Sequence, residues 1–288
     1  MGAMRVIRLL TAVVSAAVLL AGTATATASP LGYVALGDSY TSGPFIPVQT
    51  LDPLGCGRSS ANYPSVLARH LQVPLTDVSC AGADTSNMTA SQSVPFGGTN
   101  KPQFSALKAN TGLVTIGIGG NDFGVFGELI DTCPGLRASN PTGSPCKDHF
   151  TSGGVDTVKA AIAGITPRVA AVLTGIHQRS PSAAVYVIGY PRIAPETGYC
   201  PNILPFADGD YAWLSSVEEA LNAALSEASD SGEASFVDTF GPSRGHDACA
   251  PGGAAWINGK DTKLFAAAAY HPLKAGMAGV ADIIAAHL

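Results

Sequence analysis

Short apolar runs that alternate with helical patterns are the feature that most restricts how this 288-residue chain can fold. Each run is rich in β-branched or other apolar residues, as is typical of a buried strand. Because continuous apolar strands separated by helices need cover on both faces, they predict a parallel sheet with helices on either side, which is an α/β fold. The five predicted strands are 33–36, 76–80, 113–118, 185–188 and 235–237.

Helical patterns occupy the intervals between these strands and the end of the chain. In the second of them, apolar residues recur at spacings of three and four from Val155 to Val172, so they share one face. Pro167 lies inside this pattern, and we expect a kink or a split there because proline removes a helical hydrogen bond. The predicted helices are 63–71, 155–172, 211–228 and 274–286.

The N-terminus has the pattern of a secretory signal peptide. Arg5 and Arg8 precede an apolar run over 9–21, and an A-T-A sequence ending at Ala28 matches an A-x-A cleavage site. The alternative is a membrane anchor, but the apolar run is shorter than the ~20 residues that span a bilayer, and no basic stop-transfer cluster follows it.

This pattern predicts a secreted, extracellular protein. It divides the chain into a signal peptide over 1–28 and a single mature domain over 29–288. No later segment has 18 unbroken apolar residues, so we expect no stable membrane span.

The charge balance excludes one large class of partners. The chain has 16 basic and 21 acidic residues, and removal of the signal peptide takes away two arginines and no acid. The mature chain then has 14 basic and 21 acidic residues, a net charge of −7. Binding to nucleic acid requires clustered Lys and Arg, so we expect no nucleic-acid partner.

Six cysteines in an exported chain suggest three disulfides. Six cysteines allow 15 pairings, of which pairing between sequence neighbours is the simplest. A zinc site is the weaker alternative, because the chain has no C-x-x-C pair and its histidines are scattered. The cysteines are Cys56, Cys80, Cys133, Cys146, Cys200 and Cys249.

Ser39, in a G-D-S-Y turn after the first strand, is the candidate nucleophile. Functional residues of a parallel sheet gather where its strands end. A serine held there can attack an ester, and its own N–H can help to bind the oxyanion that forms. The same tripeptide is common in ordinary turns, and the G-x-S-x-G pattern of another large hydrolase fold is absent.

Two further turns at strand ends offer groups for the same chemistry. Gly82 follows the second strand, where glycine lets the backbone approach a ligand and direct its N–H inward. Asn121 follows the third strand in a G-I-G-G-N-D sequence, and its neutral amide is suited to donate to an oxyanion. The rivals are a plain turn at Gly82 and a phosphate-binding loop at Asn121, which lacks the G-x-G-x-x-G spacing.

His271 stands in a Y-H-P-L sequence just before the last predicted helix. A lone histidine is more often structural than catalytic. This one lies outside the apolar periodic positions, and Pro272 restricts the backbone beside it. These features favour an oriented imidazole that acts as a general base.

These four blocks, in this order, resemble the SGNH hydrolases, also called GDSL esterases and lipases, and above all their secreted Streptomyces-type members. The likeness covers essentially the whole mature chain and includes G-Y-P-R at 189–192, G-H-D-A-C at 245–249, Trp256 and the six cysteines. It implies a three-layer α/β/α, flavodoxin-like sandwich with a central parallel five-stranded sheet, and disulfides that pair in sequence order.

The resemblance also implies a role for each polar group. Ser39 would be the nucleophile and one oxyanion donor, and Gly82 and Asn121 would supply the other two donors. His271 would deprotonate Ser39 and then protonate the leaving alcohol.

One position departs from the pattern of most of the family. Where most members have Asp three residues before the histidine, this chain has Ala268. Some secreted actinomycete members work as a Ser–His dyad, in which a backbone carbonyl orients the ring, and that likeness implies the carbonyl of Ala269. Asp261 and Asp247 are the alternatives for a third member, ranked below the dyad.

The expected function is therefore hydrolysis of carboxylic esters by a secreted lipase or esterase with a Ser–His dyad and an acyl-enzyme. The alternatives are a phospholipase or an acetylxylan-type carbohydrate deacetylase on the same fold, and a non-catalytic secreted binding protein. The serine route needs no cofactor and no metal. The expected partner is a small-molecule or lipid ester, acted on by a monomer.

Overall fold

The computed structural model describes Met1 and residues 32–288. The predicted signal peptide and its cleavage site therefore lie outside the described residues.

Five parallel strands form the central sheet in the order β2-β1-β5-β8-β9. This is the flavodoxin-like order 2-1-3-4-5, and the predicted α/β fold is confirmed. Two small antiparallel hairpins, β3–β4 and β6–β7, lie outside it. The strands are β1 (Gly32–Gly37), β2 (Leu75–Asp77), β3 (Gln92–Ser93), β4 (Thr99–Asn100), β5 (Thr111–Gly117), β6 (Thr151–Ser152), β7 (Val155–Asp156), β8 (Ala184–Ile188) and β9 (Ser235–Val237).

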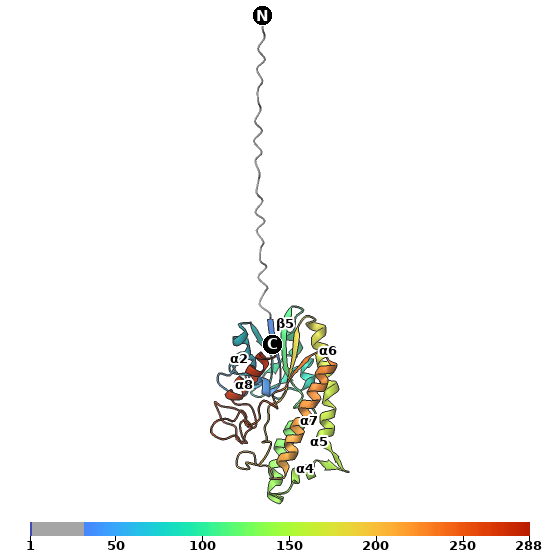
Figure 1. Cartoon of the computed structure of the whole chain (residues 1–288), viewed down its shortest axis with the longest axis vertical. Helices are drawn as coiled ribbons and strands as arrows, with labels where there is room; N and C mark the ends of the chain where they lie inside the picture. Colours follow the sequence, from blue (N-terminus) through green and yellow to red (C-terminus); the bar gives the residue numbers. More distant parts are fainter. Residues whose placement is uncertain (2–31) are drawn as a thin grey trace.

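Helices cover both faces of the sheet, with α2 and α8 on one side and α6 and α7 on the other (Figure 1). The α-helices are α1 (Ser39–Ser42), α2 (Tyr63–Leu71), α3 (Val125–Leu136), α4 (Pro145–His149), α5 (Thr157–Ala163), α6 (Ile165–Arg179), α7 (Asp210–Ser231) and α8 (Lys274–Ala285). The 3-10 turns are η1 (Leu54–Cys56), η2 (Thr85–Met88), η3 (Gln103–Ala106), η4 (Asp122–Gly124) and η5 (Arg137–Ser139).

Alternation along β1 divides the core between the two faces. Tyr33 and Ala35 pack with the apolar side chains of α2 and α8. Val34 and Leu36 point the other way, into the larger cluster that includes α5, α6 and α7. All four side chains are buried, which explains why this strand is apolar throughout.

The helix predicted over 155–172 is divided one turn before Pro167. Val155 lies in strand β7 and is exposed, and the break falls at Gly164, between α5 and α6. Pro167 is the third residue of α6, where its missing N–H has no helical partner to lose. The expected kink or split is therefore present, at the turn whose carbonyl the proline ring would meet, that of Ala163. The apolar face from Val158 onward is buried as predicted.

The second strand is shorter than predicted, because β2 ends at Asp77. The chain still follows β1, since Val78 and Cys80 donate to the carbonyls of Ala35 and Gly37 at 3.0 Å. Helices α3 and α4 were not predicted. Their segment contains four glycines and three prolines between 124 and 145, which hide the helical pattern.

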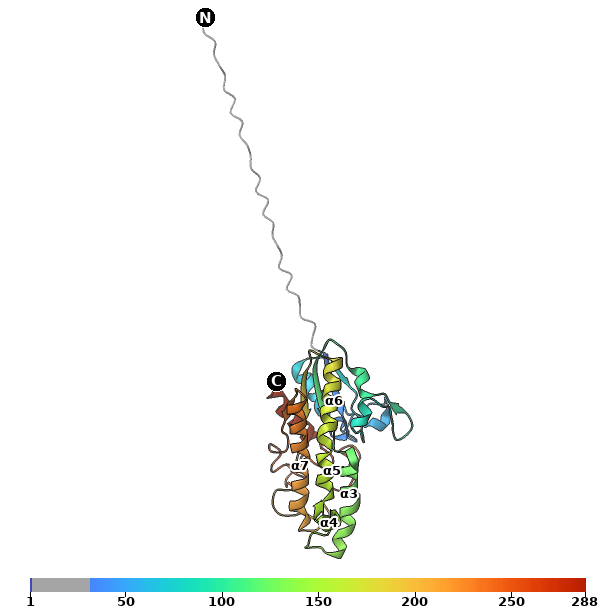
Figure 2. The same ribbon diagram turned by 90° about the vertical axis from the view of Figure 1, so that its right-hand side faces the viewer.

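The six cysteines form three disulfides in sequence order, Cys56–Cys80, Cys133–Cys146 and Cys200–Cys249. Between residues 32 and 288 one helical stretch, Thr157–Arg179, is long and apolar enough to cross a membrane. It is the α5–α6 pair, which lies beside α7 (Figure 2), and its buried apolar face belongs to the core.

Candidate active site

Ser39 is the first residue of α1, at the carboxyl end of β1, and it is buried. Asp38 caps this short helix, because its Oδ1 accepts a hydrogen bond from the Tyr40 N–H at 2.8 Å. Gly37 has φ +148°, and a Cβ there would lie 2.5 Å from the carbonyl oxygen of Gly117. Only glycine lets β1 pass so close to β5 and turn, and this holds the serine at the edge of the sheet.

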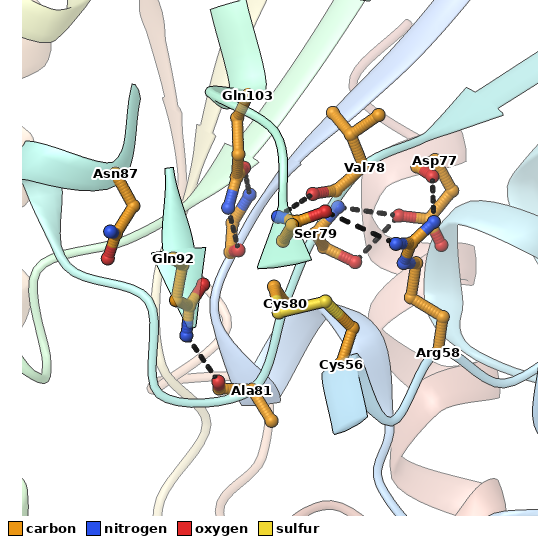
Figure 3. The surroundings of a disulfide bond; sticks show 12 residues. Cys56, Arg58, Asp77, Val78, Ser79, Cys80, Ala81, Asn87, Gln92 and Gln103 are labelled. Atoms are coloured by element: carbon orange, nitrogen blue, oxygen red, sulfur yellow. Dashed lines mark hydrogen bonds between the residues drawn. A yellow bond between two sulfur atoms is a disulfide. The ribbon is translucent and has the colours of Figure 1, made fainter. Parts of the chain in front are cut away.

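Gln103 fixes the same turn from outside. Its side-chain amide accepts from the Gly37 N–H at 2.8 Å and donates to the Gly37 carbonyl at 2.9 Å (Figure 3). The amide thus makes the pair of backbone hydrogen bonds that a neighbouring strand would make. The residue is fully buried, so both bonds are protected from water. The sequence analysis missed Gln103, because one glutamine in a 3-10 turn carries no local signal.

His271 lies next to Ser39 although 232 residues separate them in the sequence. Its Nε2 is 2.8 Å from Ser39 Oγ, and its Nδ1 is 2.6 Å from the carbonyl oxygen of Ala269. A carbonyl oxygen can only accept, so Nδ1 carries the ring proton and Nε2 is free to accept the proton of the serine hydroxyl. This is the tautomer that a general base for Ser39 requires.

Aromatic side chains enclose the imidazole. The ring centroid of His271 lies 5.2 Å from that of Tyr40 and 5.5 Å from that of Phe126. Burial lowers the pKa of His271 below its usual range, and the hydrogen bond to Ala269 opposes this effect. The imidazole of His271 is therefore neutral at neutral pH.

Asn258 positions the segment that carries the Ala269 carbonyl. Its Nδ2 donates to the carbonyls of Asp261 at 2.7 Å and Ala268 at 2.9 Å, and its backbone N–H donates to the His271 carbonyl at 2.9 Å. Asn258 is buried, and its backbone N–H and its side chain together link His271 to the segment that precedes it. The sequence analysis missed this residue too.

The two aspartates considered as a third member of a catalytic triad make other contacts. Asp247 is buried, and its Oδ1 accepts from the Cys249 N–H at 2.9 Å. The side chain of Asp261 is exposed, and its backbone carbonyl binds Asn258. The Nδ1 atom of His271 has the Ala269 carbonyl as its partner instead of either carboxylate.

Gly82 and Asn121 face the same cleft as Ser39 and His271. Gly82 is exposed and has φ +76°, a left-handed conformation that favours glycine. The Nδ2 of Asn121 donates to the carbonyl of Ala83 at 2.9 Å, so the turn that contains Gly82 holds the amide. The second hydrogen of Nδ2 remains free to donate to a bound group.

Asp122 joins the turns of Gly82 and Asn121. Its buried carboxylate accepts from the N–H and the hydroxyl of Thr85 at 3.1 and 2.5 Å, and from Arg168 at 3.0 Å. Asp122 follows β5, but its carboxylate orders the turn after β2.

Tyr190 joins the nucleophile turn to the Asn121 turn. Its hydroxyl accepts from the Gly120 N–H at 2.9 Å and donates to Asp38 Oδ2 at 2.5 Å. Burial raises the pKa of Asp38 to about 7, and the bonds from Tyr190 and the Tyr40 N–H counteract it. The two sides of the site are thereby held in one buried network.

The Cys56–Cys80 disulfide braces the backbone at Gly82 (Figure 3). Ala81, between the bridge and Gly82, donates its N–H to the Cys56 carbonyl at 2.9 Å and accepts from the Gln92 side chain at 2.8 Å. Both backbone groups of Ala81 are thus hydrogen-bonded, and this limits the movement of the Gly82 N–H.

Two hollows adjoin Ser39. The larger is an open cleft of about 930 Å³, and the smaller is a cavity of about 80 Å³ between α3 and α7. Ser39 and Asn121 line both, whereas Gly82 and His271 line only the cleft. The apolar side chains of the cavity include Val125, Leu129, Leu214, Val217 and Leu221.

Two carboxyl groups also line the cavity, that of Asp38, described above, and that of Glu218. The oxygens of Glu218 accept from the N–H groups of Ile193 and Ala194 at 3.1 Å. Burial raises the pKa of Glu218 to about 8, and these bonds oppose the rise. Burial therefore favours the neutral form of both carboxyl groups that line the cavity.

Other conspicuous residues lie away from the hollows. Trp213 donates to Asp156 at 2.7 Å and stacks on Phe150, and Trp256 stacks on His246. Within residues 32–288, no group of three or more His, Cys, Asp or Glu side chains is arranged to hold a metal ion.

Comparison with known proteins places this arrangement in a family. The model of the GDSL-like lipase/acylhydrolase family matches residues 35–278. Lipase 2 of Streptomyces coelicolor is 41% identical over 239 residues, which cover 81% of this chain and 78% of that protein. An esterase of Streptomyces scabiei is 32% identical over 256 residues, which cover 78% and 74%.

Solved structures agree in fold. Phospholipase A1 from Streptomyces albidoflavus superposes with a TM-score of 0.74 at 28% identity, and covers 90% of this chain and all of that one. The extracellular lipase from Streptomyces rimosus gives the same TM-score and coverage at 26% identity. With the family model spanning most of the described residues, the chain belongs to the GDSL-like lipase/acylhydrolase family and is a carboxylic ester hydrolase.

Proposed function

We propose that this protein is a secreted lipid esterase that works through a Ser39–His271 dyad and a covalent acyl-enzyme. One observation carries the proposal: His271 Nε2 lies 2.8 Å from Ser39 Oγ, while Nδ1 is bound to a backbone carbonyl at 2.6 Å. The serine and the base are therefore in contact, and the base is in the right tautomer.

In the first half of the reaction, Ser39 Oγ attacks the ester carbonyl carbon while its proton passes to His271 Nε2. The carbonyl oxygen becomes an oxyanion, which accepts hydrogen bonds from the N–H groups of Ser39 and Gly82 and from the amide of Asn121. The carbon–oxygen bond to the alcohol then breaks. His271 gives its proton to the departing oxygen, and the acyl group remains on Ser39.

In the second half, His271 takes a proton from water, and the resulting hydroxide attacks the acyl carbon. The same three donors bind the second oxyanion. Its collapse breaks the bond to Ser39 Oγ, which recovers the proton from His271 as the free acid leaves.

The two hollows suggest which side takes which part of the ester. His271 must reach the leaving oxygen, and it lines only the open cleft, so the alcohol part belongs there. The acyl chain then enters the apolar cavity between α3 and α7, starting at Ser39 and Asn121. Burial favours the neutral forms of Glu218 and Asp38, and a cavity with little charge suits an apolar chain.

The substrate class that fits best is a lipid acyl ester. The cleft is lined almost entirely by apolar side chains and contains no Asp, Glu, Lys or Arg, so it is poorly suited to the hydroxyl groups of an acetylated sugar. The relatives support this class, since those reported above are called lipases and an esterase. The likeness to a phospholipase A1 makes phospholipid the second candidate.

The predicted signal peptide and the likeness to an extracellular lipase support secretion of the protein. N-terminal sequencing of the protein from culture medium should begin at Ser29. A protein that stays in the cells with residues 1–28 attached would contradict this part of the proposal.

The nucleophile is tested with a fluorophosphonate probe. The wild-type protein should be labelled once per chain, and Ser39→Ala should not be labelled although it keeps its melting temperature. Ser42→Ala is the matched control, because it changes another buried serine of the same helix. Labelling that survives in Ser39→Ala would exclude this residue as the nucleophile.

The substrate is tested with a panel. p-Nitrophenyl esters of rising chain length, a phospholipid and acetylated xylan are compared by kcat/KM. We expect medium-chain esters and lipids to be preferred. A clear preference for acetylated xylan would support the deacetylase instead.

A further inference from the structure

Large apolar side chains stand exposed around the mouth of the cleft. We call six of them the apolar rim: Phe45, Val48, Leu54, Phe96, Leu264 and Phe265. Twelve large apolar side chains are exposed between residues 32 and 288, so half of them line this one opening. Scattered apolar residues are normal on a surface, but a group of this size around one opening marks an interaction site.

The outermost members extend well beyond what a single bound ester could cover. Phe96 is 84% exposed and Phe265 is 82% exposed. A substrate inside the cleft would contact the inner edge of these rings and leave most of their surface in water. Their exposure therefore indicates a partner that is broader than the cleft.

The backbone holds these rings in place at some cost. Phe45, Phe96 and Phe265 have φ values of 67°, 65° and 67°, a left-handed conformation that is unfavourable for a bulky residue. Hydrogen bonds close the turns beneath two of them, from the Val94 N–H to the Gly98 carbonyl and from the Lys263 N–H to the Ala267 carbonyl. The rings are thus presented at the tips of closed turns.

The charge pattern limits the kind of surface that the apolar rim can bind. The rim and the rest of the cleft lining include no Asp, Glu, Lys or Arg. The charged residues next to the rim in the sequence include both signs, such as Asp52 and Lys263. The mature chain has 14 basic and 21 acidic residues, a net charge of −7, so an anionic surface would repel it. A surface without net charge fits these facts.

We propose that the apolar rim docks the enzyme onto the surface of aggregated, uncharged ester lipid, with the cleft opening directly onto that surface. The inference rests on the proposed function, since it assumes that the ester is cleaved in this cleft. Aromatic side chains partition well into the lipid–water interface, and three rings on three separate loops would orient the molecule over it. An ester could then enter from the lipid without crossing water.

The experiment measures binding without hydrolysis. The mature Ser39→Ala protein is mixed with phosphatidylcholine vesicles, and the bound fraction is measured by flotation. Phe96→Ser and Phe265→Ser, each added to this background, should weaken partitioning about tenfold, since each removes most of a phenyl group from the interface. The double substitution should weaken it further.

The matched controls are Val155→Ser and Tyr199→Ser, which remove apolar groups that are 55% and 60% exposed but do not line the cleft. They should leave partitioning unchanged, and adding phosphatidylglycerol should not strengthen it. Hydrolysis of p-nitrophenyl butyrate by the wild type tests the proposed function separately, because that ester is soluble.

Three results would overturn the proposal: no vesicle binding, equal losses in rim and control variants, or binding that rises with anionic lipid. A fourth is a dimer in sedimentation equilibrium that Phe96→Ser and Phe265→Ser dissociate, because the rim would then be an interface between two copies.

Discussion

Replacement of Asn121 by alanine is the sharpest test of the oxyanion site. The amide has two hydrogens on Nδ2, and one of them is engaged with the Ala83 carbonyl at 2.9 Å. The other is the only side-chain donor in the proposed set of three, since Ser39 and Gly82 act through backbone groups. Asn121→Ala removes this donor and leaves the Ser39–His271 contact in place.

The loss should appear in kcat. Removal of one oxyanion donor lowers kcat by about 10²–10³-fold, which corresponds to about 2.7–4 kcal/mol of transition-state stabilisation. The bond strengthens as negative charge develops on the oxygen, so the ground-state complex loses little and KM should change much less. The pKa that governs activity should not move, because the imidazole keeps its surroundings.

The assay is steady-state hydrolysis of p-nitrophenyl butyrate over a range of pH. Asn87→Ala is the matched control, because Asn87 Oδ1 accepts from the Asp84 N–H at 3.0 Å and so supports the same loop outside the cleft. It should change kcat by no more than about twofold. A fall of less than about fivefold in Asn121→Ala, against the range expected for a lost donor, would remove Asn121 from the mechanism.

Three further predictions concern the base and the cavity. His271→Ala should lower kcat by about 10⁴-fold or more, whereas Asp261→Asn and Asp247→Asn should each keep most of it; a loss of about 10⁴-fold in Asp261→Asn would instead show that a carboxylate completes a triad. Because burial lowers the pKa of His271, the acid limb of the kcat/KM profile should have an apparent pKa below 6.5. An apparent pKa above that value would contradict the described surroundings of the ring. Val217→Phe should fill the cavity of about 80 Å³ and shift the preferred acyl chain to a shorter one. Val158→Phe, which overpacks a different part of the core, should reduce stability similarly without that shift, and an unchanged chain-length profile in Val217→Phe would place the acyl group elsewhere.

The main elements of the fold were predictable because their signals are local. Strand β1 is apolar over consecutive residues and helix α2 has a clear 3.6-residue period, so both were predicted within a residue or two. The break between α5 and α6 was expected from Pro167, and it falls one turn earlier because a proline disturbs the carbonyl four residues before it. A proline in the first turn of a helix costs little, and only the structure shows where that turn begins.

Some residues of the site were also predictable from the sequence, and others were not. Ser39, Gly82 and Asn121 follow predicted strands, so the rule for parallel sheets brings them to one edge. Gln103, Tyr190 and Asn258 do not follow from any such rule. Their partners Gly37, Asp38 and Ala268 are 66, 152 and 10 residues away, and their hydrogen bonds depend on the folded geometry alone.

The placement of the carboxylates explains how a dyad can serve this site. Asp38 and Asp122 are buried, but each holds a turn, and the ring of His271 is hydrogen-bonded to Ser39 and Ala269 instead. A carboxylate at Nδ1 would stabilise the imidazolium and raise the pKa of His271, whereas the Ala269 carbonyl orients the same ring with a smaller upward effect. The ring therefore stays neutral to a lower pH, and the weaker stabilisation of the imidazolium is the cost. Compared with a Ser–His–Asp triad, the proposed dyad should have a lower maximal kcat but should keep a larger fraction of its activity in mild acid. The plateau of the pH profile measures the first effect, and the apparent pKa of its acid limb measures the second.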